Sequence, residues 1–444
     1  MRRLERRAII CMTLAAVLLA GLFLFVVRYV SYGAEWATFY GNQAVYNGGV
    51  LASGAIYDVN GVLLSENGGG SINYNDDEGI RIATMHTVGD VKGNVATSAQ
   101  NVFRDKLIGY NLVTGTYKMS GKNEDITLTL DAEVCKTAYE GLSQYKAGCV
   151  GIYNYKTGEI LCKVSWPSFD PVLVEPDLAE DDTSGVYIDR FLSGTFVPGS
   201  IFKTVTSAAV IETTSDYDSF VYECSGTREV NGEDLNCAYA HGTVDFPGAL
   251  ASSCNGAFSV LTERVGAANM KAYVDKLGLT TRYDIDGVTN AAGSFEFPSD
   301  VALNLDWAGI GQYHDMVNPC SMMVYMGAIA SGGKAAVPKL LHTAISLPDT
   351  TDRMIEDATA KKLQEMMKQD VVESYGESNF PGLDIYAKTG TAEVAGHDPT
   401  AWFAGFLKDK DHPYAFVVCI EDAGEALYTA APLANSVLQA AVNG

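Results

Sequence analysis

The segment Pro198-Gly-Ser-Ile-Phe-Lys203 is the part of the sequence from which fold and chemistry are best inferred. Ser200 follows a Pro-Gly pair at which a helix can begin, and Lys203 lies three residues later on the same helix face. A serine hydroxyl becomes a nucleophile when a neighbouring base takes its proton. A lysine is such a base once burial and nearby positive charge lower its pKa from about 10.4 toward about 7–8. The segment therefore predicts a nucleophile–base pair.

The same Ser-x-x-Lys spacing occurs at Ser143–Lys146 and Ser331–Lys334, so spacing alone is not specific. The first of these lies at the end of a predicted helix, and the second lies in a Gly-Gly loop. Only Ser200 has both the Pro-Gly entry and an apolar helix after it. We therefore expect Ser200 and Lys203 to be catalytic, against the alternative of a helix-start serine beside a surface lysine.

A second motif is Ser252-Ser-Cys-Asn255. The hydroxyl of Ser253 can relay a proton to a leaving amine, and the amide of Asn255 can hold the backbone of a peptide substrate. The same Ser-x-Asn letters occur at 65–67 and 71–73. The motif therefore carries weight only together with the others.

A third motif is Ala387-Lys-Thr-Gly-Thr-Ala-Glu393, at the end of a predicted strand. Lys388 supplies a fixed positive charge and Thr389 supplies a hydroxyl. Gly390 has no side chain, so a substrate can approach the strand closely. Lys156-Thr-Gly158 has the same letters, but it lies in a predicted hairpin turn that accounts for its glycine.

The three motifs occur in the order shared by penicillin-binding proteins and serine β-lactamases. The flanking sequence resembles the class B, monofunctional, penicillin-binding proteins from about residue 125 to residue 443. The segments that carry this resemblance are Ala147-Gly-Cys-Val-Gly-Ile-Tyr153, Thr157-Gly-Glu-Ile-Leu161, Ser165-Trp-Pro-Ser-Phe-Asp-Pro171, Asp189-Arg-Phe-Leu192, Phe196-Val-Pro-Gly-Ser-Ile-Phe-Lys203, Gly309-Ile-Gly-Gln312 and Ala401-Trp-Phe-Ala-Gly-Phe406. A weaker likeness extends to residues 53–61. Because no glycosyltransferase segment precedes this region, we expect the monofunctional class.

The resemblance implies a peptidoglycan D,D-transpeptidase that cross-links D-Ala-D-Ala stem peptides and is acylated by β-lactams. Ser200 would attack the substrate carbonyl, Lys203 would take its proton, and Ser253 would help return a proton to the departing D-Ala. The other site residues implied are Asn255 and Lys388 as catalytic, and Thr389, Gly390 and Thr391 as substrate-binding. The backbone N–H groups of Ser200 and Thr391 would form the oxyanion hole.

Two other functions share these motifs: a serine β-lactamase or β-lactam sensor, and a non-catalytic scaffold for wall synthesis. A class A β-lactamase uses a glutamate to activate the deacylating water, and no Glu-x-x-Leu-Asn pattern follows Ser253. A scaffold has no use for an intact Ser200, Lys203 and Lys388. We therefore favour the transpeptidase.

Residues 8–28 predict a single transmembrane anchor, because twenty apolar residues span about 30 Å as a helix. The arginines in the tail, residues 1–7, place that end in the cytoplasm and the rest of the chain outside it. A cleaved signal peptide is the alternative, but its apolar region is usually only about 7–15 residues. The resemblance adds a polytopic membrane glycosyltransferase as a partner.

The segments after the anchor predict an α+β protein with two further parts. Residues 29–124, the stalk, contain a predicted hairpin around Asn60-Gly61. Residues 125–444, the transpeptidase domain, begin with a strand at 126–130 and a hairpin at 148–164, and end with strands and a helix. We expect an antiparallel sheet flanked by helices. Helices are predicted at 132–145, 201–213, 247–264, 268–277, 316–331, 356–374 and 431–442, and late strands at 383–389, 401–407 and 414–420.

Charge and cysteine content limit the partners and cofactors. The net charge of −23 excludes nucleic acid, which requires a basic surface. Catalysis by serine and lysine needs no cofactor. Cys224, Cys237, His241 and Cys254 have the spacing Cys-x12-Cys-x3-His-x12-Cys, and three thiolates with one imidazole suit tetrahedral zinc. An external location favours a Cys224–Cys237 disulfide instead, and unpaired buried thiols are the third alternative.

Overall fold

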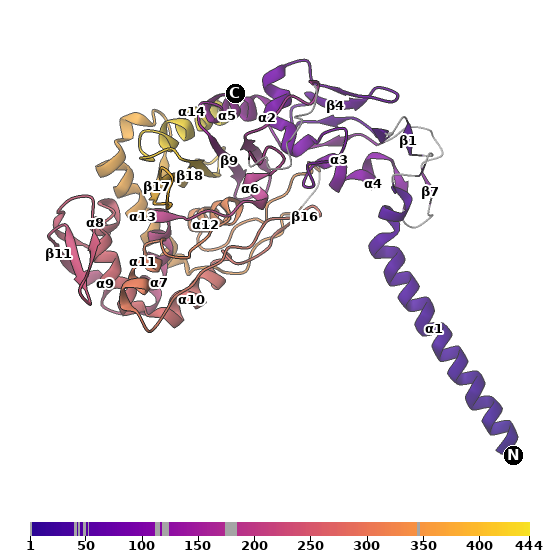
Figure 1. Cartoon of the computed structure of the whole chain (residues 1–444), viewed down its shortest axis with the longest axis horizontal. Helices are drawn as coiled ribbons and strands as arrows, with labels where there is room; N and C mark the ends of the chain where they lie inside the picture. The colour runs from indigo at the N-terminus through magenta and orange to yellow at the C-terminus, as the bar shows by residue number, and fades with distance from the viewer. Residues whose placement is uncertain are drawn as a thin grey trace.

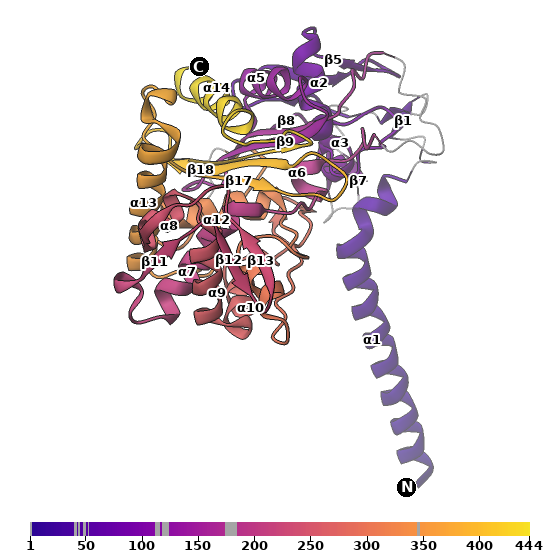
Figure 2. The same cartoon turned by 60° about the vertical axis from the view of Figure 1, so that its left-hand side comes forward.

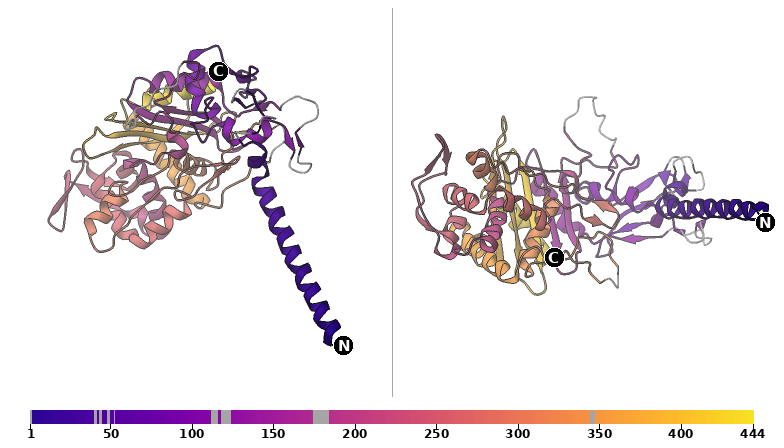
Figure 3. Two further views of the ribbon diagram at one scale, coloured as in Figure 1. Left: turned by 45° about the vertical axis from the view of Figure 1, so that its right-hand side comes forward. Right: turned by 90° about the horizontal axis from the view of Figure 1, so that it is seen from below.

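The structure is a computed structural model that describes residues 2–39, 42, 45–47, 50–51, 53–111, 116–117, 124–173, 184–343 and 347–444. A long helix, α1 (Arg2–Ala37), projects away from the rest of the molecule (Figures 1 and 3). A region rich in short strands joins it to a larger body of helices around a sheet. The predicted class, α+β with an N-terminal apolar helix, is confirmed.

Helix α1 extends beyond the predicted anchor, 8–28, at both ends. The part of the helix that is apolar enough to span a membrane is Arg2–Gly33, and its most apolar stretch is not buried against other parts of the protein. Large apolar side chains are exposed on every face, as in Leu14, Leu18 and Phe23. A helix with this all-round apolar surface is stable when lipid covers it.

The stalk contains a four-stranded sheet in the order β5 (Ile72–Tyr74), β4 (Leu63–Asn67), β3 (Ile56–Tyr57) and β8 (Ile126–Thr127). The hairpin predicted around Asn60-Gly61 is confirmed, because β3 and β4 pair antiparallel across it. The predicted strand 126–130 is shorter and pairs parallel with β3. One sheet therefore crosses the predicted stalk boundary and ties the two parts together.

The main sheet has five antiparallel strands in the order β10-β9-β19-β18-β17. The strands are β9 (Ala147–Asn154), β10 (Ile160–Trp166), β17 (Ile385–Ala392), β18 (Thr400–Leu407) and β19 (Tyr414–Glu421). Helices α5 (Ala132–Leu142) and α14 (Ala430–Asn443) cover one face, and α12 (Pro319–Ala330) covers the other (Figure 2). Every residue of β18 and α12 is buried, which explains their continuous apolar sequences.

The helical side of the sheet carries the nucleophile segment. The helix predicted at 201–213 begins as a 3-10 turn, η1 (Gly199–Phe202), and continues as α7 (Lys203–Thr213). The single helix predicted at 247–264 is wrong: α8 (Phe246–Ala251) and α9 (Asn255–Val265) are separate. The break occurs because Ser253 has a φ of 52°, which a continuing right-handed helix cannot contain. The helix predicted at 356–374 is α13 (Asp357–Asp370) followed by a π-helical turn, η3 (Val371–Tyr375).

The remaining elements include α10 (Ala267–Lys276), which confirms the helix predicted at 268–277; the others are short or were not predicted. Two small two-stranded sheets lie between α7 and α8 in the sequence: β11 pairs with β14, and β12 pairs with β13. Their bounds are β11 (Val221–Cys224), β12 (Thr227–Val230), β13 (Glu233–Asn236) and β14 (Gly242–Asp245). The others are β1 (Tyr46–Asn47), β2 (Val50–Leu51), α2 (Glu78–Val88), α3 (Ala99–Val102), α4 (Arg104–Leu107), β6 (Tyr110–Asn111), β7 (Thr116–Tyr117), α6 (Arg190–Ser193), η2 (Tyr217–Ser219), β15 (Asp284–Ile285), β16 (Val288–Thr289), α11 (Ala302–Gly309) and η4 (Glu377–Asn379).

A close backbone approach joins η1 to the edge strand β17. A Cβ atom added to Gly390 would lie 2.8 Å from the carbonyl oxygen of Pro198 and 3.1 Å from the nitrogen of Ile201. Both neighbours are main-chain atoms, so neither can rotate away. Gly390 therefore sets the distance between the nucleophile turn and the strand.

We expect Gly390→Ala to push η1 away from β17. The substitution should cost about 1–3 kcal/mol of folding free energy through overpacking and should slow acylation of Ser200. Gly382→Ala is the control for loss of stability alone: its φ of 77° strains an alanine, but nothing lies within 4 Å of the added Cβ in this exposed turn, so acylation of Ser200 should keep its wild-type rate. Thermal unfolding and labelling with a fluorescent penicillin measure both effects. Acylation at the wild-type rate in Gly390→Ala would contradict this account.

Candidate active site

Ser200 lies in the middle of η1, directly before α7. Two neighbouring elements fix this turn. The indole Nε1 of Trp402, a buried residue of β18, donates a hydrogen bond of 2.9 Å to the carbonyl of Val197. Gly199 has a φ of 56°, and a Cβ there would lie 2.7 Å from the carbonyl of Thr391. The nucleophile turn is thus held against the sheet by the indole of Trp402 on one side and by a close main-chain approach to Thr391 on the other.

Lys203 is fully buried one helical turn beyond Ser200. Its Nζ lies 3.1 Å from the Oγ of Ser200 and 3.0 Å from the Oγ of Ser253. It also lies 2.7 Å from the carbonyl oxygen of Ser253 and 2.7 Å from the Oδ1 of Asn255. The first two predicted motifs therefore meet at a single amine.

The partners of Lys203 fit the neutral amine. The carbonyl of Ser253 and the Oδ1 of Asn255 can only accept hydrogen bonds, so they take the two N–H donors of a neutral lysine. The orientation of Asn255 is fixed, because its Nδ2 donates a 2.7 Å bond to the carbonyl of Asn236. The single lone pair of Nζ is then left to accept from one hydroxyl at a time, that of Ser200 or that of Ser253. A hydroxyl that donates to Lys203 is the arrangement needed for proton abstraction.

Electrostatics favour the same state. Burial and, as the second cause, the positive charge of Lys388 together lower the pKa of Lys203 from 10.5 to about 7. About half of the Lys203 side chains are therefore neutral near pH 7.

The loop that carries Ser253 is a strained turn between α8 and α9. Ser253 adopts its left-handed φ of 52° while its N–H bonds to the carbonyl of Leu250 at 3.0 Å. Cys254, the next residue, caps α9 by accepting a bond from the N–H of Ala257. A non-glycine residue in this conformation costs about 1 kcal/mol or more, and such residues concentrate at functional sites.

The third motif lies on β17, beside η1. Lys388 is buried, with its Nζ 3.2 Å from the Oδ2 of Asp370 and 3.3 Å from the hydroxyl of Tyr375. Tyr375 also lies 3.0 Å from the Oγ1 of Thr389. Thr391 is exposed at the strand edge. No hydrogen bond between Lys388 and Ser253 is found among the described residues.

Sequence reasoning did not find Asp370 and Tyr375. Asp370 is the last residue of α13 and is fully buried, and Tyr375 ends the π-helical turn. Burial raises the pKa of Asp370 to about 6, although the charge of Lys388 opposes this shift. The π turn brings both side chains to Lys388, and no sequence pattern marks such a turn. An acidic residue at the end of an otherwise amphipathic helix was the one available signal.

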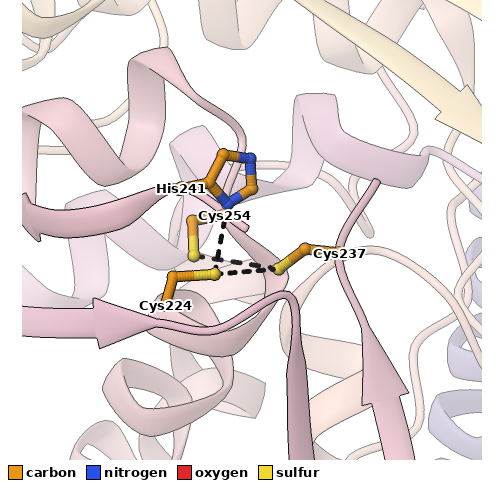
Figure 4. Close-up of side chains that lie close together, drawn as sticks. All are labelled: Cys224, Cys237, His241 and Cys254. Carbon is orange, nitrogen blue, oxygen red and sulfur yellow. Dashed lines mark hydrogen bonds between the residues drawn. The ribbon is translucent and has the colours of Figure 1, made fainter. Parts of the chain in front are cut away.

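The predicted cysteine and histidine set is brought together beside the same loop (Figure 4). The sulfurs of Cys224 and Cys237 lie 3.7 Å apart, and those of Cys237 and Cys254 lie 3.8 Å apart. The Nδ1 of His241 lies 3.3 Å from the sulfur of Cys224. The alternative of a Cys224–Cys237 disulfide is not formed in this structure, because a disulfide needs about 2.05 Å between sulfurs.

Comparison with known proteins identifies the chain. The family model of the penicillin-binding protein transpeptidase domain matches residues 148–439. The chain belongs to this penicillin-binding family. Peptidoglycan D,D-transpeptidase PbpA of Mycolicibacterium smegmatis is 27% identical over 382 residues, which cover 76% of each chain. Stage V sporulation protein D of Bacillus subtilis is 26% identical over 349 residues, covering 71% of this chain and 53% of that protein.

Solved structures show the same fold. Penicillin-binding protein A from M. tuberculosis, solved as an acyl-enzyme complex, matches 88% of this chain and 98% of its own with a TM-score of 0.77. The sequence identity in that alignment is 22%, so the likeness concerns the fold. Membership of the penicillin-binding family and the predicted sheet with flanking helices are both confirmed.

We expect acylation of Ser200 to depend on pH through Lys203. Because the pKa of Lys203 is lowered to about 7, its neutral form predominates above that value and its protonated form below. The second-order rate of acylation by a fluorescent penicillin should therefore rise with pH and level off above about pH 8. A stopped-flow or gel-based time course measures it. A rate that stays constant between about pH 5.5 and about pH 8.5 would show that Lys203 is not the base.

Proposed function

We propose that this protein is a peptidoglycan D,D-transpeptidase that cross-links stem peptides through an acyl-enzyme on Ser200 and is acylated by β-lactams at the same residue. The observation that carries this proposal is the contact of Ser200 with a buried lysine whose other partners accept its N–H groups. Family membership and the D,D-transpeptidase activity named for the relatives support it.

In the first half-reaction, the Oγ of Ser200 attacks the carbonyl carbon of the penultimate D-Ala while its proton passes to the Nζ of Lys203. The C–N bond to the terminal D-Ala then breaks. Ser253 delivers its hydroxyl proton to the departing amine and takes up in exchange the proton that Lys203 holds, since the two side chains are in contact. In the second half-reaction, the amine of another stem peptide attacks the acyl-enzyme, and Ser200 regains its proton as the new amide forms.

We assign Lys388, Thr389 and Thr391 to the terminal carboxylate of the stem peptide. Lys388 provides a fixed charge, and the two threonines provide hydroxyl donors on the edge strand β17. The backbone N–H groups of Ser200 and Thr391 form the oxyanion hole, where one donor contributes about 10²–10³ in rate. Gly390 keeps these two N–H groups on neighbouring backbones at close range.

We place the catalytic body on the extracellular side of the cytoplasmic membrane. The four arginines before residue 8 hold the start of α1 in the cytoplasm by the positive-inside rule. The exposed apolar surface of α1 also provides a contact for other membrane helices. We propose a polytopic membrane glycosyltransferase as that partner, which would supply the glycan strands that this enzyme cross-links.

We further propose that Cys224, Cys237, His241 and Cys254 hold a structural zinc ion. A tetrahedral site with Zn–S bonds of about 2.3 Å places its sulfurs about 3.8 Å apart, which agrees with the two measured spacings. Hydrogen bonds from Cys254 and from the N–H of Gly256 hold the pKa of Cys237 below its usual range, and the thiolate is the form that binds metal.

A zinc ion at this place would support catalysis through the chain. Cys254 lies between Ser253 and Asn255, both of which contact Lys203. Cys237 follows Asn236, whose carbonyl orients Asn255. The ion would brace both loops and take no part in bond making or breaking.

Labelling with a fluorescent penicillin tests the transpeptidase. We expect a stable covalent adduct with the wild type and none with Ser200→Ala, while the unfolding temperature of the variant stays close to that of the wild type. The adduct should persist, since the site has no group assigned to activate a deacylating water. Rapid release of hydrolysed penicillin would favour a β-lactamase. Normal cross-linking of stem peptides by Ser200→Ala would favour a scaffold.

Elemental analysis tests the metal site. We expect about one zinc per chain in the wild type and in His412→Ala, a control histidine outside the cluster, and much less in His241→Ala. A chelator should lower the unfolding temperature of the wild type by several degrees. Purified protein without zinc, with either a Cys224–Cys237 disulfide or unreacted thiols by thiol titration, would exclude the zinc site.

A further inference from the structure

Behind the Lys-Thr-Gly strand lies a buried group that belongs to none of the three motifs. The hydroxyl of Tyr375 is 2.8 Å from the Oδ2 of Asp370 and accepts a 2.9 Å hydrogen bond from the backbone N–H of Thr389. The Nζ of Lys388 lies within 3.3 Å of both Asp370 and Tyr375. Asp370 is fully buried, and Tyr375 is 5% exposed. Asp370 and Tyr375 thus contact the side chain of Lys388, and Tyr375 also contacts the backbone of Thr389.

The hydrogen-bonding capacity of Tyr375 fixes the direction of these bonds. A phenol has one donor and two acceptor sites. A carboxylate only accepts, so the hydroxyl donates to Asp370 and takes the N–H of Thr389 on one lone pair. The second lone pair faces the Nζ of Lys388 and the Oγ1 of Thr389. Tyr375 thereby aligns both residues that we assign to the substrate carboxylate.

The charges in the site are distributed unequally. Lys203 and Lys388 are both buried, and the positive charge of one disfavours a charge on the other. All four hydrogen-bond partners of Lys203 are neutral oxygens. Lys388 has a carboxylate at 3.2 Å. A buried charge is stable only when it is paired, so the counter-ion decides which lysine keeps its proton.

We propose that Asp370 and Tyr375 are positioning residues of this site: Asp370 keeps the positive charge on Lys388 and off Lys203, and Tyr375 aligns Lys388 and Thr389 with the substrate carboxylate. This inference rests on the proposed transpeptidase function. It explains how one site holds a neutral lysine as base and a charged lysine as anchor.

The titratable groups that face this pair are limited. Lys388 comes from β17, Asp370 from the end of α13, Tyr375 from η3 and Lys203 from the start of α7. The thiols of Cys254 and Cys237 act on Lys203 from farther away. Among the described residues, Asp370 is the only carboxylate in ion-pair range of either lysine. Removing its charge therefore leaves both lysines without a counter-ion.

The Asp370→Asn variant tests the charge. Asparagine has the same shape and still accepts from Tyr375, so the fold should persist. Without the carboxylate, a buried positive charge on Lys388 has no counter-ion and is disfavoured, so the charge that binds the carboxylate of a fluorescent penicillin is weakened. We expect the acylation rate of the variant to fall at least about tenfold between about pH 7.5 and about pH 9.

Asp384→Asn is the matched control. Asp384 precedes β17 and pairs with Lys368 at 3.1 Å, but its side chain is 50% exposed. The wild type and this control should keep their acylation rate within about twofold over the same pH range. If the profile of Asp370→Asn is parallel to that of the wild type, the proposed role of the charge is overturned.

The Tyr375→Phe variant tests alignment separately. It keeps both charges and removes the acceptor for the N–H of Thr389, so acylation should slow about tenfold at every pH without an alkaline fall. Wild-type rates in this variant would overturn the alignment role. If Asp370→Asn shows no cooperative thermal unfolding, that variant does not fold, and the acylation rate of Tyr375→Phe alone then decides whether the inference stands. Loss of labelling in Ser200→Ala, with unchanged profiles in these variants, would refute this inference and leave the proposed function standing.

Discussion

The burial of Lys203 without a counter-ion is the constraint on which the site depends. An amine removed from water and placed near a second lysine favours its neutral form, provided that its two N–H groups find acceptors. The carbonyl of Ser253 and the amide of Asn255 are those acceptors. The strained turn at Ser253, the separate start of α9 and the contact of η1 with β17 all serve to keep these atoms around one nitrogen.

The sequence predicted the parts of the site that depend on local order. The Pro-Gly entry before Ser200 and the Lys-Thr-Gly letters at the end of a strand are local signals, and both lie where the pattern indicated. The late strands and the 148–164 hairpin were also predicted, because apolar residues in short continuous runs mark buried strands. The spacing and type of Cys224, Cys237, His241 and Cys254 predicted them as candidate metal ligands, and the structure brings them together.

Features that arise from tertiary contacts were not predictable in this way. The helix expected at 247–264 has the right periodicity, yet it breaks at Ser253, where a turn is held by bonds back to Leu250 and Ala249. The π turn that carries Tyr375 to Lys388 leaves no mark on the apolar pattern. The strand pairs β11–β14 and β12–β13 consist of four-residue strands, and their sequences do not differ clearly from those of loops. Contacts with α9, such as the hydrogen bond of Arg228 to Glu263, become visible only in the structure.

The length of α1 has a consequence for where the enzyme works. Nine residues of this helix, 29–37, continue beyond the predicted anchor, and at 1.5 Å per residue they rise about 13 Å. The head-group layer on one side of a bilayer is only about 5–8 Å thick. With residues 8–28 in the bilayer, a continuous helix and not a flexible linker extends beyond the lipid. This keeps the rest of the chain at a nearly constant distance from the membrane surface.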